Sequence, residues 1–219
     1  MNSSGFSTRE VVMTPRRLAG FLSTPEKAPG LVLFAHGSGS SRLSPRNTMV
    51  AKRLNEAGVA TLLFDLLTEG ESADRGNVFD IGLLAGRLLE ATAWARNEAG
   101  FEALPIGYFG ASTGAGAALM AAADEHAEVA AVVSRGGRPD LAGAAALNAV
   151  RAPTLLIVGS KDVQVLELNR QALAELRCEK KLEVVSGASH LFEEAGTLER
   201  AADLAAGWFQ RCFSKSRRA

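Results

Sequence analysis

The sequence is poor in cysteine and carries no excess of charge of either sign. Its two cysteines, Cys178 and Cys212, form no CxxC pair, so the chain offers neither a disulfide framework nor a cysteine-rich metal site. Lysine and arginine together number 24, as do aspartate and glutamate, so no global field attracts nucleic acid. We therefore expect no metal and no nucleic-acid partner.

Long apolar runs are also missing from the sequence. No segment approaches the ~20 apolar residues that a membrane-spanning helix requires. The polar segment Met1–Glu10 lacks the apolar core of a secretory signal peptide. These two absences predict a protein without membrane contact, and the cytoplasm is its expected location.

Short apolar runs are present, and they alternate with longer segments of helical periodicity. Runs rich in Val, Leu, Ile and Phe, bounded by Gly, Pro and Asp, are typical of strands that are buried on both faces. They predict strands at Glu10–Met13, Leu18–Ser23, Leu31–Ala35, Ala60–Leu66, Ile106–Gly110, Val129–Ser134, Thr154–Val158 and Lys181–Val185. The intervening segments predict helices at Arg46–Ala57, Phe79–Glu98, Thr113–Glu125, Val163–Leu176 and Thr197–Phe213.

This order of elements predicts a single α/β domain over residues 1–219. The first two strands, separated by Thr14–Arg17, should form an antiparallel hairpin at one edge of the sheet. The later strands alternate with helices, which favours a mostly parallel, doubly wound sheet of about eight strands. No gap between core strands is long enough for a large cap domain, so we expect an open active site.

The segment Gly110–Gly114 reads GASTG, which matches the GxSxG pattern of a nucleophilic serine. It follows the predicted strand at Ile106 and opens a helix of small residues, which is the context that this motif requires. The flanking glycines are needed because side chains at those positions would collide with neighbouring backbone. Ser112 is therefore the predicted nucleophile.

A serine hydroxyl needs a base to accept its proton, and the chain has three histidines that could supply one. His190 follows the last predicted strand on a loop and is the predicted base. His126 lies at a helix end, where a solvated or capping role is expected. His36 follows the strand Leu31–Ala35 and is expected to shape the next turn.

Asp162 lies just beyond the penultimate predicted strand, at the same sheet edge as Ser112 and His190. The chain order of serine, aspartate and histidine is that of α/β-hydrolases and differs from the two common serine-protease orders. We therefore expect Asp162 to orient His190. The alternative is that Asp162 only caps the helix that begins at Val163.

Backbone N–H groups near Ser112 are the candidates for an oxyanion hole. The usual arrangement pairs the residue after the nucleophile with a residue in the loop after the third strand. Here these residues are Thr113 and Ser38, with Gly39 as the alternative to Ser38.

Five short segments carry a resemblance to a known family: His36–Gly37, Asp65, and the runs GASTG, GSKD and GASHLF. With these segments the chain resembles α/β-hydrolases of the dienelactone hydrolase family over almost its whole length. That family uses a cysteine where this sequence has Ser112, which favours a carboxylesterase here. The resemblance also implies that Asp65 has an architectural role. The chain is similar, too, to small hydrolases that occur fused to phosphoribosyltransferases.

These residues predict a serine hydrolase that cleaves small carboxylic esters or lactones through an acyl-enzyme on Ser112. No cofactor is expected. The alternatives are thioester hydrolysis or acyl transfer by the same residues and, in another class, a noncatalytic binding module. Without a cap, little apolar surface covers a long acyl chain, so short acyl groups should be preferred.

Arg135 and Arg138 lie directly after the strand that should neighbour the nucleophile strand. At the catalytic edge, their guanidinium groups would select substrates that bear a carboxylate or phosphate. The alternative is that Arg138 pairs with Asp140 while Arg135 is solvated. In the loop after the third strand, Arg42 and Arg46 are rival contacts for an anion.

Overall fold

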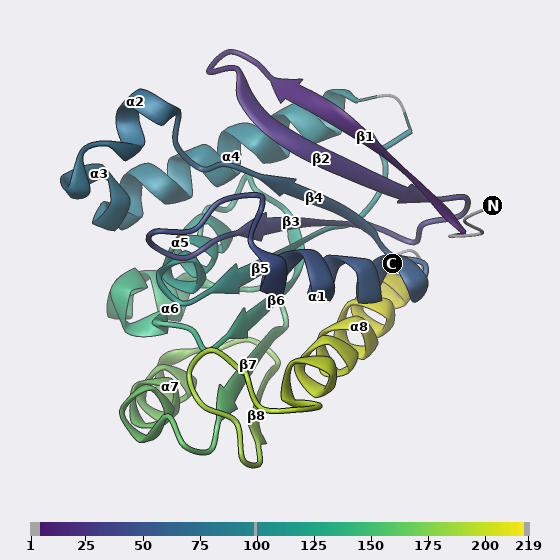
Figure 1. The fold of residues 1–219 in the computed structure, drawn as a ribbon. Coiled ribbons are helices and arrows are strands. Elements are labelled where there is room, and N and C mark those ends of the chain that lie inside the picture. Colours follow the sequence, from purple (N-terminus) through teal and green to yellow (C-terminus); the bar gives the residue numbers. More distant parts are fainter. Residues whose placement is uncertain (1–4, 99, 217–219) are drawn as a thin grey trace.

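The computed structural model describes residues 5–98 and 100–216. The two ends of the expected domain, residues 1–4 and 217–219, lie outside the described residues. The described chain forms one sheet with the strand order β1-β2-β4-β3-β5-β6-β7-β8 (Figure 1). Its strands are β1 (Phe6–Met13), β2 (Leu18–Pro25), β3 (Leu31–Ala35), β4 (Ala60–Phe64), β5 (Ile106–Ala111), β6 (Val129–Arg135), β7 (Thr154–Gly159) and β8 (Lys180–Val185).

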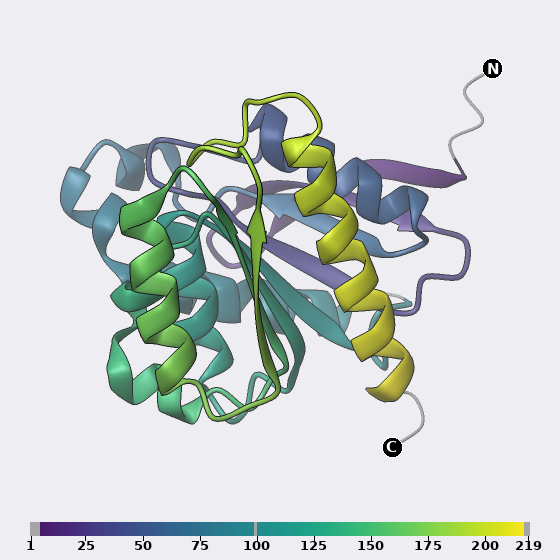
Figure 2. The ribbon, with the colours of Figure 1, turned by 90° about the horizontal axis from the view of Figure 1, so that it is seen from below.

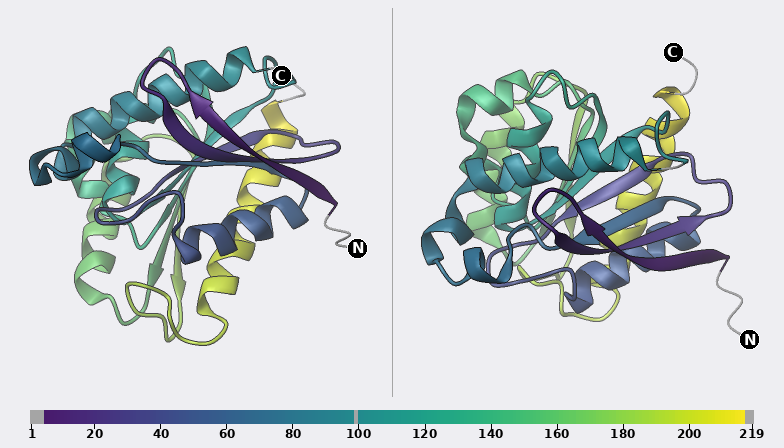
Figure 3. Two further views of the ribbon diagram at one scale, coloured as in Figure 1. Left: turned by 45° about the horizontal axis from the view of Figure 1, so that its top comes forward. Right: turned by 90° about the horizontal axis from the view of Figure 1, so that it is seen from above.

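The sheet is antiparallel at one edge and parallel elsewhere. β1 pairs with β2 and β2 pairs with β4 in antiparallel register, and every pairing from β4 to β8 is parallel. The β1–β2 hairpin lies at the edge beside β4 (Figure 3). The mostly parallel, doubly wound sheet that the sequence predicts is therefore confirmed, and its parallel strands bring their carboxyl ends to one edge.

Helices cover both faces of the sheet. α1 and α8 pack on one face, while α4, α5, α6 and α7 pack on the other, and Figure 2 shows α7 and α8 on opposite sides. The helices are α1 (Pro45–Glu56), α2 (Glu69–Ser72), α3 (Arg75–Phe79), α4 (Ile81–Asn97), α5 (Thr113–Ala122), the 3-10 helix η1 (Pro139–Ala142), α6 (Gly143–Ala149), α7 (Val163–Glu175) and α8 (Thr197–Ser216).

The central strands form a rigid core beneath the candidate site. β3, β4, β5 and β7 are buried along their whole length. Alternate residues face opposite layers: Leu33 and Tyr108 pack toward α4 and α5, whereas Phe34 and Phe109 pack toward α1 and α8 with their ring centroids 4.7 Å apart. Burying one apolar side chain of this size stabilises the folded state by roughly 1.5–3 kcal/mol. This packing fixes the strand ends that carry the functional side chains.

Two of the helix predictions need correction. The predicted helix Phe79–Glu98 is divided at Asp80, whose carboxylate accepts a hydrogen bond from the Leu83 N–H at 2.9 Å and so begins α4 at Ile81. The short helices α2 and α3 precede that point and were not predicted, because four or five residues are too few to show a helical period. The predicted helix from Thr113 ends at Ala122, three residues before Glu125.

Among residues 5–98 and 100–216, no helix combines the length and the apolar composition that crossing a membrane requires.

Candidate active site

Ser112 occupies a strained turn between β5 and α5. Its backbone has φ 51° and ψ −123°, a region that residues with a side chain rarely adopt and that a strand-to-helix nucleophile turn imposes. A Cβ on Gly114 would lie 2.1 Å from the Ala35 carbonyl oxygen, and one on Gly110 would lie 2.4 Å from the Ala115 Cα. The prediction that both flanking positions require glycine is confirmed.

The structure brings Ser112, His190 and Asp162 together at the carboxyl ends of the strands. Oγ of Ser112 lies 3.4 Å from Nε2 of His190, and Nδ1 of His190 lies 2.6 Å from Oδ2 of Asp162. Since an ionised carboxylate only accepts hydrogen bonds, Nδ1 carries the proton and Nε2 is left free to accept one from Ser112. The serine–histidine contact is long, as is common before a substrate binds.

Asp162 is also the residue immediately before α7, which bears on the alternative that it only caps that helix. Its side chain makes no capping hydrogen bond with α7. The carboxylate turns instead to His190 and is largely buried, with 13% of the side chain exposed. The geometry therefore favours a contact with the base over a cap.

Glu194 anchors the loop that carries His190, and it was not among the site residues predicted from the sequence. Its Oε2 accepts hydrogen bonds from the Ser189 N–H at 2.9 Å and from the Ser189 hydroxyl at 3.2 Å. These bonds, led by the backbone N–H of Ser189, lower the pKa of Glu194 to about 2. The sequence shows only that Glu194 belongs to an acidic pair after GASHLF. Such a pair does not predict a bond to the backbone, because exposed acidic side chains are usually solvated.

The two candidates for the oxyanion hole lie in direct contact. The Ser38 N–H donates to Oγ1 of Thr113 at 2.8 Å, so this donor is occupied in the structure. Gly37 packs closely on the nucleophile, since a Cβ there would lie 3.1 Å from Cβ of Ser112. The loop after β3 is thus held against the serine turn, with Gly39 further along at φ 69°.

His36 is held as a neutral ring away from the nucleophile. Its Nδ1 donates to the Gly37 carbonyl at 3.0 Å, and its Nε2 accepts from the Leu66 N–H at 3.1 Å. Burial lowers the pKa of His36, against a smaller opposing effect of the bond to Gly37. The ring ties the loop after β3 to the end of β4, as expected for a residue that shapes the turn.

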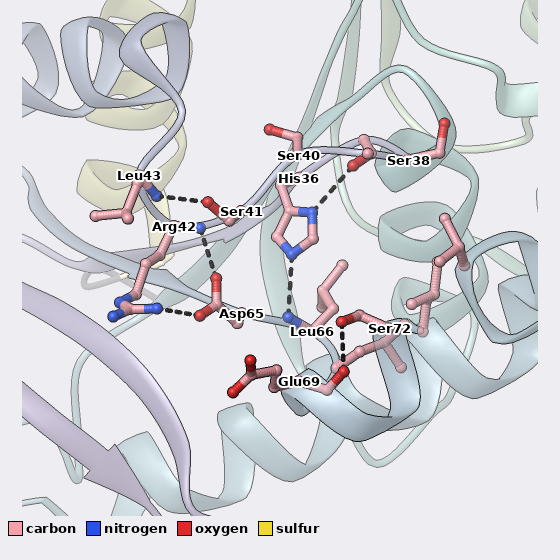
Figure 4. A pocket seen from close by; sticks show the side chains of 15 residues that line it. His36, Ser38, Ser40, Ser41, Arg42, Leu43, Asp65, Leu66, Glu69 and Ser72 are labelled. Carbon is pink, nitrogen blue, oxygen red and sulfur yellow. Dashed lines mark hydrogen bonds and ion pairs between the residues drawn. The ribbon is translucent and has the colours of Figure 1, made fainter. Parts of the chain in front are cut away.

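Two neighbouring cavities open beside these residues. The smaller, of about 270 Å³, contains Ser112, His190 and Arg135 and is here called the nucleophile cavity. The larger, of about 530 Å³, lies over the ends of β3 and β4 and is here called the adjacent cavity (Figure 4). Gly37, Ser38 and Ser40 line both. Ser112 and His190 line the nucleophile cavity and not the adjacent one, so the candidate reacting groups lie in the smaller space.

Most arginines near the site are already paired. Arg42 forms an ion pair with Asp65 and also donates its backbone N–H to that carboxylate at 2.7 Å (Figure 4). Asp65 is therefore an architectural residue, as the resemblance implies. Arg138 binds Asp140 through two hydrogen bonds, of 2.8 and 2.7 Å, and does not line the nucleophile cavity. This matches the alternative reading of Arg138.

Arg135 contradicts the second half of that alternative, because it is not solvated. Only 7% of the residue is exposed, and it lies beside Ala111 in the register between β5 and β6. Its carbonyl accepts a hydrogen bond from the Ser112 N–H at 3.3 Å. Arg135 is the last residue of β6, next to the strand that leads to Ser112, and its side chain is buried there. Hydropathy alone does not reveal that burial.

The fold and the strained serine turn define an α/β-hydrolase. The family model for the alpha/beta hydrolase domain matches residues 28–206, and the chain belongs to that family. The chain is dienelactone hydrolase-like: a solved dienelactone hydrolase from Anabaena variabilis is 53% identical, with a TM-score of 0.88 over 94% of this chain and 97% of that one.

Curated relatives extend beyond the length of this chain. Two proteins of Mycobacterium tuberculosis, from strains CDC 1551 and H37Rv, are each 60% identical over 200 residues, which is 91% of this chain. Each bears the name "Putative phosphoribosyl transferase", and the chain spans 45% of their length. A solved esterase from Pyrococcus furiosus shares the fold at 18% identity, with a TM-score of 0.77 over 95% of this chain and 93% of that one.

Proposed function

We propose that this protein is a serine hydrolase that cleaves small carboxylic esters or lactones. The observation that carries the proposal is the geometry of one line of side chains: Oγ of Ser112 faces Nε2 of His190, whose opposite nitrogen is bonded to Asp162. A nucleophile, a base and a group that orients the base are the parts that acyl transfer requires.

The proposed reaction has two halves. Oγ of Ser112 attacks the carbonyl carbon as His190 takes the hydroxyl proton, and the alcohol then leaves with that proton as the acyl-enzyme forms. Water, deprotonated by the same histidine, attacks the acyl-enzyme and releases the acid together with the free serine. Asp162 keeps Nδ1 protonated throughout and stabilises the imidazolium that forms in each half.

Backbone donors are proposed to stabilise the tetrahedral oxyanion. Thr113 contributes its N–H from the first turn of α5, where the helix N-terminus favours negative charge. Ser38 contributes the second N–H. In the structure this N–H donates to the Thr113 hydroxyl, and during the reaction it would donate to the developing oxyanion instead. The strain at Ser112 helps to fix these donors before the reaction begins.

The relatives' name raises a second candidate, phosphoribosyl transfer. The residues that this chain shares with those proteins cover 45% of their length, and here they form a hydrolase fold with a nucleophilic serine turn. We therefore assign hydrolysis to this chain and leave phosphoribosyl transfer to the remainder of those longer proteins. Thioester hydrolysis and transfer to an alcohol would use the same residues, so they differ only in the acceptor and the leaving group.

Turnover of a neutral aryl acetate tests the proposal. Ser112→Ala and His190→Ala should each remove nearly all activity, while both variants keep the wild-type circular dichroism spectrum. His126→Ala is the matched control, since it removes an exposed histidine that does not line the cavity of Ser112 and His190. Wild-type turnover in Ser112→Ala, or none in the wild-type protein on any ester, lactone or thioester, would contradict the proposal.

A further inference from the structure

Arg135 is a charged side chain of the nucleophile cavity that the proposed mechanism does not use. It ends β6, and β6 lies between the strand of the nucleophile and β7, which leads to Asp162. Arg46 and Asn47, from the first turn of α1, line the same cavity. A positive group is therefore built into the wall that faces Ser112 and His190.

The guanidinium of Arg135 is poorly satisfied by the described residues. Within residues 5–98 and 100–216, its Nε and Nη1 find no hydrogen-bond acceptor. Nη2 donates to Oδ1 of Asn47 at 3.4 Å, and the group lies 5.7 Å from the ring of Phe192. A buried guanidinium ordinarily has a carboxylate partner, because an uncompensated charge in a protein interior is strongly unfavourable.

The charged side chain that acts on Arg135, that of Arg46, is also positive, so it does not compensate the charge of Arg135. Burial, and then the charge of Arg46, lower the pKa of Arg135 to about 10, so the side chain stays charged at neutral pH. The first turn of α1 has no acidic residue, and the N-terminus of a helix itself attracts anions. Arg46 forms an ion pair with Glu193 at 3.9 Å, but Glu193 is 65% exposed, so solvent screens its effect.

We propose that Arg135, with Arg46, binds an anionic group of the ester substrate, a carboxylate or a phosphate, beside the scissile carbonyl. The inference rests on the proposed function, because it names the class of substrate for the same cavity. The anion supplies the counter-charge that the cavity wall lacks, and it holds the substrate with its carbonyl toward Ser112. The nucleophile cavity is small, so the anionic group and the ester lie close together in the substrate.

The competing explanation is that Arg135 only braces the end of β6 against α1 through Asn47 and Phe192. Both roles predict that replacing Arg135 is harmful, so loss of activity alone does not separate them. A brace affects every substrate in proportion, whereas an anion site affects only substrates that carry the anion. The ratio of specificity constants on matched substrates therefore decides between them.

The test uses three aryl esters with one leaving group, whose acyl parts are neutral, carboxylate-bearing or phosphate-bearing. Wild-type kcat/KM should be highest on one of the two anionic esters, and which one it is identifies the anion. Arg135→Gln should lower kcat/KM on that ester about 10- to 100-fold more than on the neutral ester, as expected for loss of a charged hydrogen bond. Arg46→Gln, at a more exposed position, should show a smaller selective loss.

Arg138→Gln is the matched control, because it removes a guanidinium from the following loop outside the cavity. Its effect should be the same on all three esters. In the wild-type protein, inorganic phosphate or acetate should inhibit hydrolysis of the neutral ester competitively, and added salt should weaken the anionic preference. This second measurement needs no variant, so the proposal stays testable if Arg135→Gln does not fold.

Equal losses on all three esters in Arg135→Gln, or no inhibition by either anion together with no anionic preference, would overturn the inference. Turnover of the neutral ester separates this failure from that of the proposed function. A protein that hydrolyses the neutral ester without an anionic preference remains a serine hydrolase. A protein that hydrolyses none of the three, and no other ester, lactone or thioester, loses both proposals.

Discussion

Asp162 accepts a hydrogen bond from Nδ1 of His190 at 2.6 Å, although it occupies the N-cap position immediately before α7, where it makes no capping hydrogen bond. An aspartate in this place usually binds an N–H of the first helical turn. Here α7 forgoes that bond, and the carboxylate faces the loop after β8. A residue that could stabilise its own helix is directed to a histidine 28 positions away.

Asp162→Asn should lower kcat by ~10⁴ on a neutral ester, as in serine-protease triads, because an amide favours the wrong tautomer of His190. The free energy of unfolding should change little, since no capping bond is lost. Steady-state kinetics and urea unfolding measure the two quantities. Asp140→Asn, which removes the partner of Arg138, is the control and should leave kcat close to wild type. Wild-type turnover in Asp162→Asn would mean that another carboxylate orients the base.

Glu194→Ala should reduce kcat roughly ten- to a hundred-fold with a smaller change in KM, because the loop that positions His190 loses its bonds to Ser189. Glu199→Ala, at an exposed position on α8, is the control and should keep wild-type kinetics. The pKa of Glu194 is lowered to about 2. Its carboxylate therefore stays ionised, and keeps its bonds to Ser189, until the pH falls toward about 2. The kinetic deficit of the variant should therefore persist at mildly acidic pH. A change confined to KM would argue against a positioning role.

Protonation of His36 should destabilise the folded protein. Its pKa is lowered by burial, so below the ordinary value of 6.5 the unfolded chain binds a proton that the folded chain resists. Stability from the neutral ring is present above that value and declines as pH falls, by at most about 1.4 kcal/mol per pH unit. In urea unfolding, the stability advantage of wild type over His36→Gln should shrink between about pH 7.5 and about pH 5.5. A constant or growing advantage would contradict the assignment of His36 as a buried neutral ring.

Short acyl groups should be the best substrates. The nucleophile cavity holds about 270 Å³, and within residues 5–98 and 100–216 no large cap covers the sheet and could shield a long chain. Specificity constants measured from acetyl to decanoyl esters of one alcohol should peak among the shortest members. A steady rise to the longest chain would show that the adjacent cavity, or a surface beyond it, binds acyl groups.

Much of the fold could be predicted from the sequence, because its signals are local. Each buried strand from Leu31 onward is an apolar run, and the glycines around Ser112 report a steric need that the structure confirms at Ala35 and Ala115. The prediction of one continuous helix from Phe79 was wrong because, in the sequence, Asp80 looks like any polar residue on the exposed side of a helix. Whether an aspartate caps a helix depends on its backbone angles, which the sequence does not specify.

The site could be predicted only in part, because several of its contacts join distant segments. That Ser112, His190 and Asp162 lie together was predictable, since each follows a strand and the carboxyl ends of parallel strands meet at one edge. The burial of Arg135 was not identifiable, because an arginine in a glycine-rich segment is usually exposed. The Ser189–Glu194 bonds were likewise hidden, since they depend on how the loop folds back on itself.

Covalent labelling of the nucleophile tests the central claim most directly. A fluorophosphonate should form one adduct per chain, and peptide mass spectrometry should place it on Ser112. The rate of labelling should fall sharply in His190→Ala and in Asp162→Asn, and labelling should be absent in Ser112→Ala. An unlabelled wild-type protein, or an adduct on another serine with Ser112 unmodified, would contradict the account.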